Sequence, residues 1–210
     1  MYKRQTVRGA IDPIKEISEI CKQRKIWLHI DGSIGGIFAI TSIPIEGLNN
    51  NLLAYELSPS VTLLEESLCK WFSKKIGFND FSGGIAASGG TLSNLNALIA
   101  ARNNAGLGTN PNSVLLVSED AHSSFVKCIR VMGLDTRNLV RIKTDNQGRM
   151  DINDLRNSID KCSIENKKIF AIVATLGTTV RGAIDPIKEI SEICKQRNIW
   201  LHIDLSLIHI

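Results

Sequence analysis

The 210-residue sequence lacks several features that would assign it to a class at once. No uninterrupted apolar run approaches the roughly 20 residues of a membrane-spanning helix, and the start of the chain has no apolar signal-peptide core. Although 25 Lys and Arg residues exceed 21 Asp and Glu residues, no basic run is interleaved with aromatic residues. We therefore expect a cytoplasmic protein whose partners are neither membranes nor nucleic acids.

Cysteine pairs are also missing. The chain has five cysteines, and none of them belongs to a CxxC pair. This spacing indicates neither a disulfide framework nor a zinc site, so we expect reduced structural thiols and no bound metal. The hydrophobic content of 43% is ample for a buried core.

Strand-like and helix-like segments alternate along the chain, as they do in βαβ units. Short apolar runs predict strands, and spacings of three and four between apolar residues predict helices. The expected strands are 83–87, 113–118, 138–144, 169–175 and 199–204, and the expected helices are 58–76, 91–104, 122–132, 151–161 and 186–197. Asp185 is the expected N-cap of the last helix, with Pro186 at its first position. The pattern favours an α/β fold with a parallel or mixed sheet covered by helices.

Residues able to carry chemistry follow four of the predicted strands. The turn SGGT (88–91) opens a helix and offers backbone N–H groups, a hydroxyl and the positive end of the helix dipole to a phosphate. His122 lies just past the strand 113–118, and TLGTT (175–179) and HID (202–204) add hydroxyls and a carboxylate. Each has an ordinary structural alternative: a tight turn, a surface or helix-capping histidine, and a plain N-cap at Asp204.

The four strand ends together make a stronger case than any one of them. A phosphate cup, a histidine that stacks on a ring and an aspartate that keeps a pyridine nitrogen protonated are what a pyridoxal 5'-phosphate site requires.

Six ordered runs carry a family resemblance: ELSPSVTLLEESL, GGIAASGGTLSNLNALIAAR, VSEDAHSSFVKC, GRMDINDL, VATLGTT and IWLHID. In this order the chain closely resembles the group II pyridoxal-phosphate-dependent amino acid decarboxylases, which include aromatic amino acid, glutamate and diaminobutyrate decarboxylases. The resemblance covers residues 50–204. It implies an incomplete large domain of the aspartate-aminotransferase-like (fold type I) fold, with a mixed, mostly parallel sheet and flanking helices. It also implies an amino acid substrate and a homodimer for the intact enzyme. Another enzyme of the same cofactor fold, such as a lyase or a desulfurase, fits less well, because ELSPSVTLLE and SEDAHSS point to the decarboxylases.

The resemblance also implies roles for individual residues. Gly90 and Thr91 resemble the family's phosphate-binding pair, and His122 resembles the catalytic histidine that stacks on the cofactor ring. Thr179 resembles the threonine near the cofactor. Asp204 resembles the aspartate that pairs with the pyridine nitrogen, and Asp31 is the matching position in a second copy of the same segment.

One family element is missing from the sequence. The family's cofactor lysine lies in an Asn-Pro-His/Gln-Lys segment, and no Asn-Pro-x-Lys occurs here; the chain's single Asn-Pro, at 110–111, is followed by Asn and Ser. Without that lysine the covalent link to the cofactor cannot form. We therefore expect this chain to be an inactive piece of a carboxy-lyase that removes the α-carboxylate of an L-amino acid as CO2.

A duplicated segment suggests how the chain arose. Residues 6–31 and 179–204 differ only at Lys25 and Asn198, a closeness that diverged structural repeats do not normally keep. The family's continuation after His-Ile-Asp follows the first copy, as HIDGSIGGIFAI, and not the second. We therefore interpret residues 6–49 as a downstream piece displaced to the front of the upstream piece 50–204. A natural permuted paralogue, folded and non-catalytic, that acts as a binding or oligomerisation module is the alternative.

The two ends resemble translated adapter DNA. LSLIHI (205–210) matches one reading frame of the mosaic-end sequence used in transposon-based sequencing libraries, and MYKRQ (1–5) matches its reverse complement. These matches favour a rearranged library fragment over a natural permutant.

Amplification from source genomic DNA tests this hypothesis. We expect no product across the codons for residues 48–51, because the two pieces are not adjacent in the genome. Primers within residues 60–200 provide the positive control. A product across the join with the size and sequence encoded here would refute the rearrangement.

Overall fold

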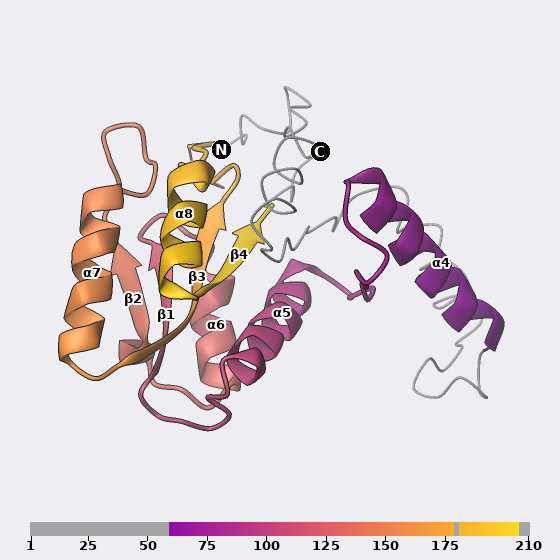
Figure 1. Cartoon of the computed structure of the whole chain (residues 1–210), viewed down its shortest axis with the longest axis horizontal. Coiled ribbons are helices and arrows are strands. Elements are labelled where there is room, and N and C mark those ends of the chain that lie inside the picture. The colour runs from indigo at the N-terminus through magenta and orange to yellow at the C-terminus, as the bar shows by residue number, and fades with distance from the viewer. Residues whose placement is uncertain (1–58, 179–180, 206–210) are drawn as a thin grey trace.

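The structure is a computed structural model, and it describes residues 59–178 and 181–205. The described elements begin with two consecutive helices, after which helices and strands follow one another along the chain (Figure 1). In chain order they are α4 (Pro59–Lys75), α5 (Gly90–Asn104), β1 (Ser113–Ser118), α6 (Ser124–Val131), the short 3-10 helix η2 (Thr136–Asn138), β2 (Leu139–Ile142), α7 (Ile152–Ile164), β3 (Lys168–Thr175), α8 (Ile187–Arg197) and β4 (Trp200–Asp204).

The four strands form one sheet in the order β2-β1-β3-β4, and every neighbouring pair is parallel. β1 lies between β2 and β3, so the chain moves outward in one direction from β1 to β2 and then returns to the other side for β3 and β4. A reversal of this kind creates a switch point at the carboxyl ends of the two central strands, where open α/β sheets bind ligands. β1 and β3 are those strands.

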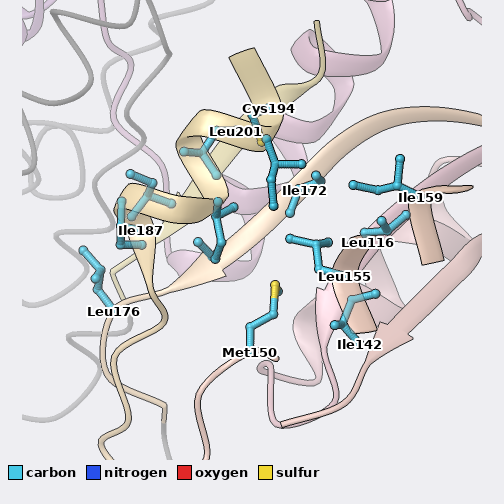
Figure 2. Close-up of a cluster of buried hydrophobic side chains, with 14 of the residues drawn as sticks. Leu116, Ile142, Met150, Leu155, Ile159, Ile172, Leu176, Ile187, Cys194 and Leu201 are labelled. Carbon is cyan, nitrogen blue, oxygen red and sulfur yellow. The ribbon is translucent and has the colours of Figure 1, made fainter. Parts of the chain in front are cut away.

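Both faces of the sheet are covered, which explains why the strands are almost wholly apolar. Successive side chains of β1 point to opposite faces: Val114 and Leu116 belong to one core cluster, and Leu115 and Val117 belong to the other. The first cluster is shared with α7 and α8 and is shown in Figure 2, and the second is shared with α5 and α6. The fully buried side chains in the two clusters show that this sheet forms the core of the described part of the chain.

Local sequence signals determine where the helices begin and end. The Asp151 carboxylate caps α7 by accepting hydrogen bonds from Asn153 N (2.7 Å) and Asp154 N (3.1 Å). At the C-terminal end of α8, Asn198 takes the left-handed conformation with φ 52°, which asparagine tolerates better than most residues. These signals are local, and the sequence predicted both helices to within a few residues.

Most predicted elements are confirmed, and one is wrong. All five predicted helices are present, and four of the five predicted strands are found at or within two residues of the expected bounds. Residues 83–87 do not form a strand: the segment pairs with no strand among the described residues, and Ile85 is 68% exposed. An apolar run becomes a strand only where a neighbour satisfies its backbone groups. The predicted strand is an irregular connection from α4 to α5.

The expected capping role of Asp185 is also wrong: Pro186 is the N-cap of α8 and not its first helical residue, and no side chain among the described residues caps the helix. Asp185 is 2% exposed, and its two carboxylate oxygens accept hydrogen bonds from Met150 N and Thr175 N, both at 2.7 Å. Burial raises the pKa of Asp185 to about 6; the two backbone hydrogen bonds oppose this shift, and the charges of Asp145 and Asp120 add to it. The carboxylate ties the end of β3 to the turn before α7.

We expect Asp185→Asn to remove part of the pH dependence of stability. Because the folded-state pKa lies above the ordinary value of 3.8, the folded chain binds this proton more readily than the unfolded chain does. The contribution of Asp185 to stability therefore rises as pH falls through about 6. From pH 7 to pH 3 the free energy of unfolding of wild type should gain roughly 3 kcal/mol relative to the variant.

Urea unfolding at several pH values measures this difference. Asp160→Asn is the matched control, because Asp160 lies on α7 with its side chain 59% exposed, where water screens its ion pair with Arg197; this change should alter stability by less than about 1 kcal/mol. Parallel profiles for wild type and Asp185→Asn would contradict the assignment.

Candidate functional site

The carboxyl ends of β1 and β3 place two of the predicted segments at the switch point. His122 comes four residues after Ser118, the last residue of β1. Thr178 follows the end of β3, is 1% exposed and accepts a hydrogen bond from Ala183 N through its hydroxyl (3.1 Å). Both segments follow strands, as the sequence pattern predicted, and the structure shows that these are the two central strands.

The N-terminus of α5 reaches this same edge. α5 is followed by β1, and its last turn leads to the first residue of that strand, so the helix runs antiparallel to the sheet and begins near the carboxyl ends. Gly90 and Thr91 are its first two residues, and Gly89 has no side chain with which to cap them. The first intrahelical donors are Leu92 N and Ser93 N, which bond to Gly89 O at 3.0 and 3.1 Å. A Cβ added to Gly89 would meet no atom within 4 Å, so there is open space at the residue that precedes the helix.

His122 is held by the helix that follows it. Its Nδ1 accepts a hydrogen bond from Ser124 N (3.2 Å), the first residue of α6. An Nδ1 that accepts is unprotonated, so the neutral ring carries its proton on Nε2. The expected alternative of a helix-capping histidine is therefore partly correct, and the same contact sets the orientation of the ring.

Asp204 is the last residue of β4 and is only 1% exposed. It is aligned with Thr175 at the end of β3. On α6, the Cys128 Sγ lies 3.7 Å from Thr91 O of α5. Burial raises the pKa of the Cys128 thiol to about 11, with the Asp204 charge as the second cause. The direct link from α5 to β4 is the side chain of Asn94, which lies 3.0 Å from Nε2 of His202, two residues before Asp204.

Two predicted site residues lie outside the described residues: Thr179, beside Thr178, and Asp31, in the first copy of the duplicated segment. The other four lie in the described part, at the start of α5 (Gly90, Thr91), before α6 (His122) and at the end of β4 (Asp204).

Asn94 is a site residue that sequence reasoning missed. It is 2% exposed on the inner face of α5, and its side chain contacts Ser124 Oγ at 3.5 Å and His202 Nε2 at 3.0 Å. The available signal was its spacing. Asn94 lies one turn before Leu98 and two turns before Ala101 and Arg102, on the face that those residues bury. A polar residue on the apolar face of a helix points to a buried partner.

The arrangement fits pyridoxal 5'-phosphate. The exposed start of a helix with space beside it suits a phosphate, and a buried carboxylate suits a protonated ring nitrogen. Within residues 59–178 and 181–205, no three His, Cys, Asp or Glu residues are grouped so as to hold a metal ion. No helix in this described part has the length and apolar character needed to cross a membrane.

Comparison with known proteins identifies the family. The family model described as "Pyridoxal-dependent decarboxylase conserved domain" matches residues 42–206. The acidic amino acid decarboxylase GADL1 of Xenopus tropicalis is 36% identical over 168 residues, which cover 77% of this chain and 33% of that protein. Human GADL1 is 35% identical over 168 residues, with 77% and 32% covered. The chain spans about a third of the length of these relatives.

Comparison with solved structures gives the same fold. Mouse CSAD superposes with a TM-score of 0.72 at 31% identity, covering 82% of this chain and 37% of that one. The Catharanthus roseus tryptophan decarboxylase in complex with L-tryptophan gives 0.73 at 21% identity, covering 98% and 51%, a likeness that shows the fold alone.

These findings confirm three of the predictions made from the sequence. The fold is the α/β fold of the fold type I decarboxylases, present here in part, and the family's cofactor is pyridoxal phosphate. The match covers well over half of the chain. The chain therefore belongs to the family of pyridoxal-phosphate-dependent amino acid decarboxylases.

Proposed function

We propose that this chain holds the phosphate-binding and pyridine-binding residues of an L-amino acid decarboxylase whose intact form releases the α-carboxylate as CO2. The observation that carries the proposal is the 3.0 Å contact between Asn94 of α5 and His202 of β4, which brings the helix that begins at Gly90 to the strand that ends at Asp204. In this proposal residues 50–204 are the upstream part of the cofactor domain, residues 6–49 are its displaced downstream neighbour, and the intact enzyme is a homodimer.

The start of α5 would hold the phosphate. The Gly90 and Thr91 N–H groups belong to the first turn, where helix geometry leaves donors without intrahelical acceptors. The positive end of the helix dipole favours an anion at this position. The Thr91 side chain is exposed, so its hydroxyl is accessible for a further hydrogen bond.

Asp204 would hold the pyridine nitrogen. Its burial strengthens the interaction of its negative charge with a proton on that nitrogen, because water screens the pair less. When bound, the protonated ring accepts the electron pair released as the carboxylate leaves. Asp204 keeps that proton in place and sets the position of the ring relative to β4.

His122 would lie against the ring face, and Thr179 would lie near the cofactor at the end of the β3 loop. The bond from Ser124 N to His122 Nδ1 fixes the ring as an Nε2–H donor. The ring group that can donate a hydrogen bond in the site is therefore Nε2–H.

The missing lysine determines what this chain can do alone. With no Asn-Pro-x-Lys segment in the sequence, we propose that the chain binds the cofactor without a covalent bond and does not turn over substrate. If the first copy of the duplicated segment occupies the place of the second, Asp31 takes the role of Asp204.

A binding titration tests the proposal. The purified 210-residue chain, mixed with pyridoxal 5'-phosphate and followed by the absorbance of the ligand, should show saturable binding. Asp204→Asn should weaken this binding about tenfold or more, because a charge-assisted hydrogen bond is lost. Asp160→Asn, at an exposed aspartate, is the control and should bind as wild type does.

Borohydride treatment tests the absence of a covalent link. We expect no reduced adduct at any single lysine by peptide mass spectrometry. A specific adduct would overturn the non-covalent proposal, and a wild-type chain that does not bind the cofactor would overturn the assignment of the site.

A further inference from the structure

Asn94 lies where three elements of the cofactor site meet. It belongs to α5, its amide nitrogen donates to Ser124 Oγ of α6 at 3.5 Å, and its amide oxygen lies 3.0 Å from His202 Nε2 of β4. All three residues are at least 98% buried. Water therefore cannot replace these contacts, and each buried polar group depends on its protein partner.

The direction of these bonds determines the protonation of His202. The Asn94 nitrogen faces Ser124, so the Asn94 oxygen faces the ring and accepts its hydrogen bond. His202 Nε2 must then carry a proton. The rings of Phe125 and His202 pack in a T-shaped pair, with a centroid distance of 6.0 Å and an interplanar angle of 79°, which restricts the rotation of the imidazole.

Each of the three elements contributes, or holds, one residue of the proposed cofactor site. α5 begins with Gly90, four residues before Asn94. The residue bonded to Asn94 on α6 is Ser124, whose backbone N–H also holds His122. On β4 the contacted residue is His202, two positions before Asp204 and therefore on the same face of the strand.

We propose that Asn94 is the positioning residue of this site: it holds His202 as an Nε2–H donor and sets the spacing between α5, α6 and β4. Asn94 touches no cofactor atom in this proposal, and acts through its neighbours as an outer-shell residue does. The part that concerns the cofactor rests on the proposed function, whereas the state of the His202 ring does not.

The protonation of His202 tests the first half of the proposal without any cofactor. The full chain, labelled with 15N at its four histidines, is studied by imidazole 1H–15N correlation at neutral pH, and His202→Gln assigns the signal. Wild type should show a ring protonated at Nε2. Asn94→Leu, which removes the acceptor, should give a mixture of ring states.

Two further variants separate positioning from stability. Asn94→Asp keeps an oxygen facing the ring and should keep Nε2 protonated. Leu98→Ala, one turn along the same buried face, lowers stability through a cavity but touches no polar group, and it should leave the ring as in wild type. An unprotonated Nε2 in wild type, or the same mixture in Leu98→Ala as in Asn94→Leu, would overturn the proposal.

The affinities for two ligands test whether Asn94 sets the spacing between α5 and β4. Pyridoxal 5'-phosphate needs both the start of α5 and the end of β4, whereas inorganic phosphate needs only the start of α5. We expect Asn94→Leu to weaken pyridoxal 5'-phosphate binding about tenfold, as for one buried hydrogen bond, and to change phosphate binding less than about twofold. Leu98→Ala should change the two affinities by equal factors.

The two proposals fail in different ways. Equal losses of both ligands in Asn94→Leu would refute the spacing role while leaving the cofactor site intact. Failure of wild type to bind pyridoxal 5'-phosphate would refute the proposed function, and the ring protonation would still decide whether Asn94 holds His202.

Discussion

The parallel pairing of β1 with both β2 and β3 is the constraint on which the rest of the described structure depends. Because the strands run in one direction, their carboxyl ends meet at a single edge. Because β1 is followed outward by β2 and the chain then returns for β3, the connections diverge at that edge and leave room beside it. The segments that follow β1 and β3, and the last residue of β4, lie there for this topological reason and for no local one.

Two buried polar side chains, Asp185 and Asn94, hold the segments at this edge together through partners elsewhere in the chain. Asp185 accepts two backbone hydrogen bonds, one from the end of β3 and one from the turn before α7. Asn94 connects α5 to α6 and β4. Such contacts add little net stability, because water would satisfy the same groups in the unfolded chain, but they penalise other arrangements strongly. We infer that the apolar clusters stabilise the sheet and that these polar bonds define the geometry of its edge.

The sequence predicted the elements that the apolar pattern determines, and its wrong predictions concern contacts between distant segments. An apolar run and its flanking turns were sufficient to predict residues 113–118 and 169–175 as strands, because burial on both faces leaves a continuous apolar pattern. The same rule misassigned residues 83–87, since the pattern contains no information about whether a neighbouring strand is present. Asp185 looks like an N-cap in the sequence, because its position before Pro186 is typical of one. The two distant N–H groups that it accepts from are not visible along the chain.

The sequence by itself determined the order and type of most elements, the family, and the positions of Gly90, Thr91, His122 and Asp204 at element ends. These depend on periodicity, caps and ordered motifs, all of which are local in the chain. Only the tertiary structure decided that α5, α6 and β4 meet at Asn94, and that Cys128 of α6 lies against Thr91 of α5. Contacts between residues 30 or 108 positions apart depend on strand order and helix packing, which no short stretch of sequence encodes.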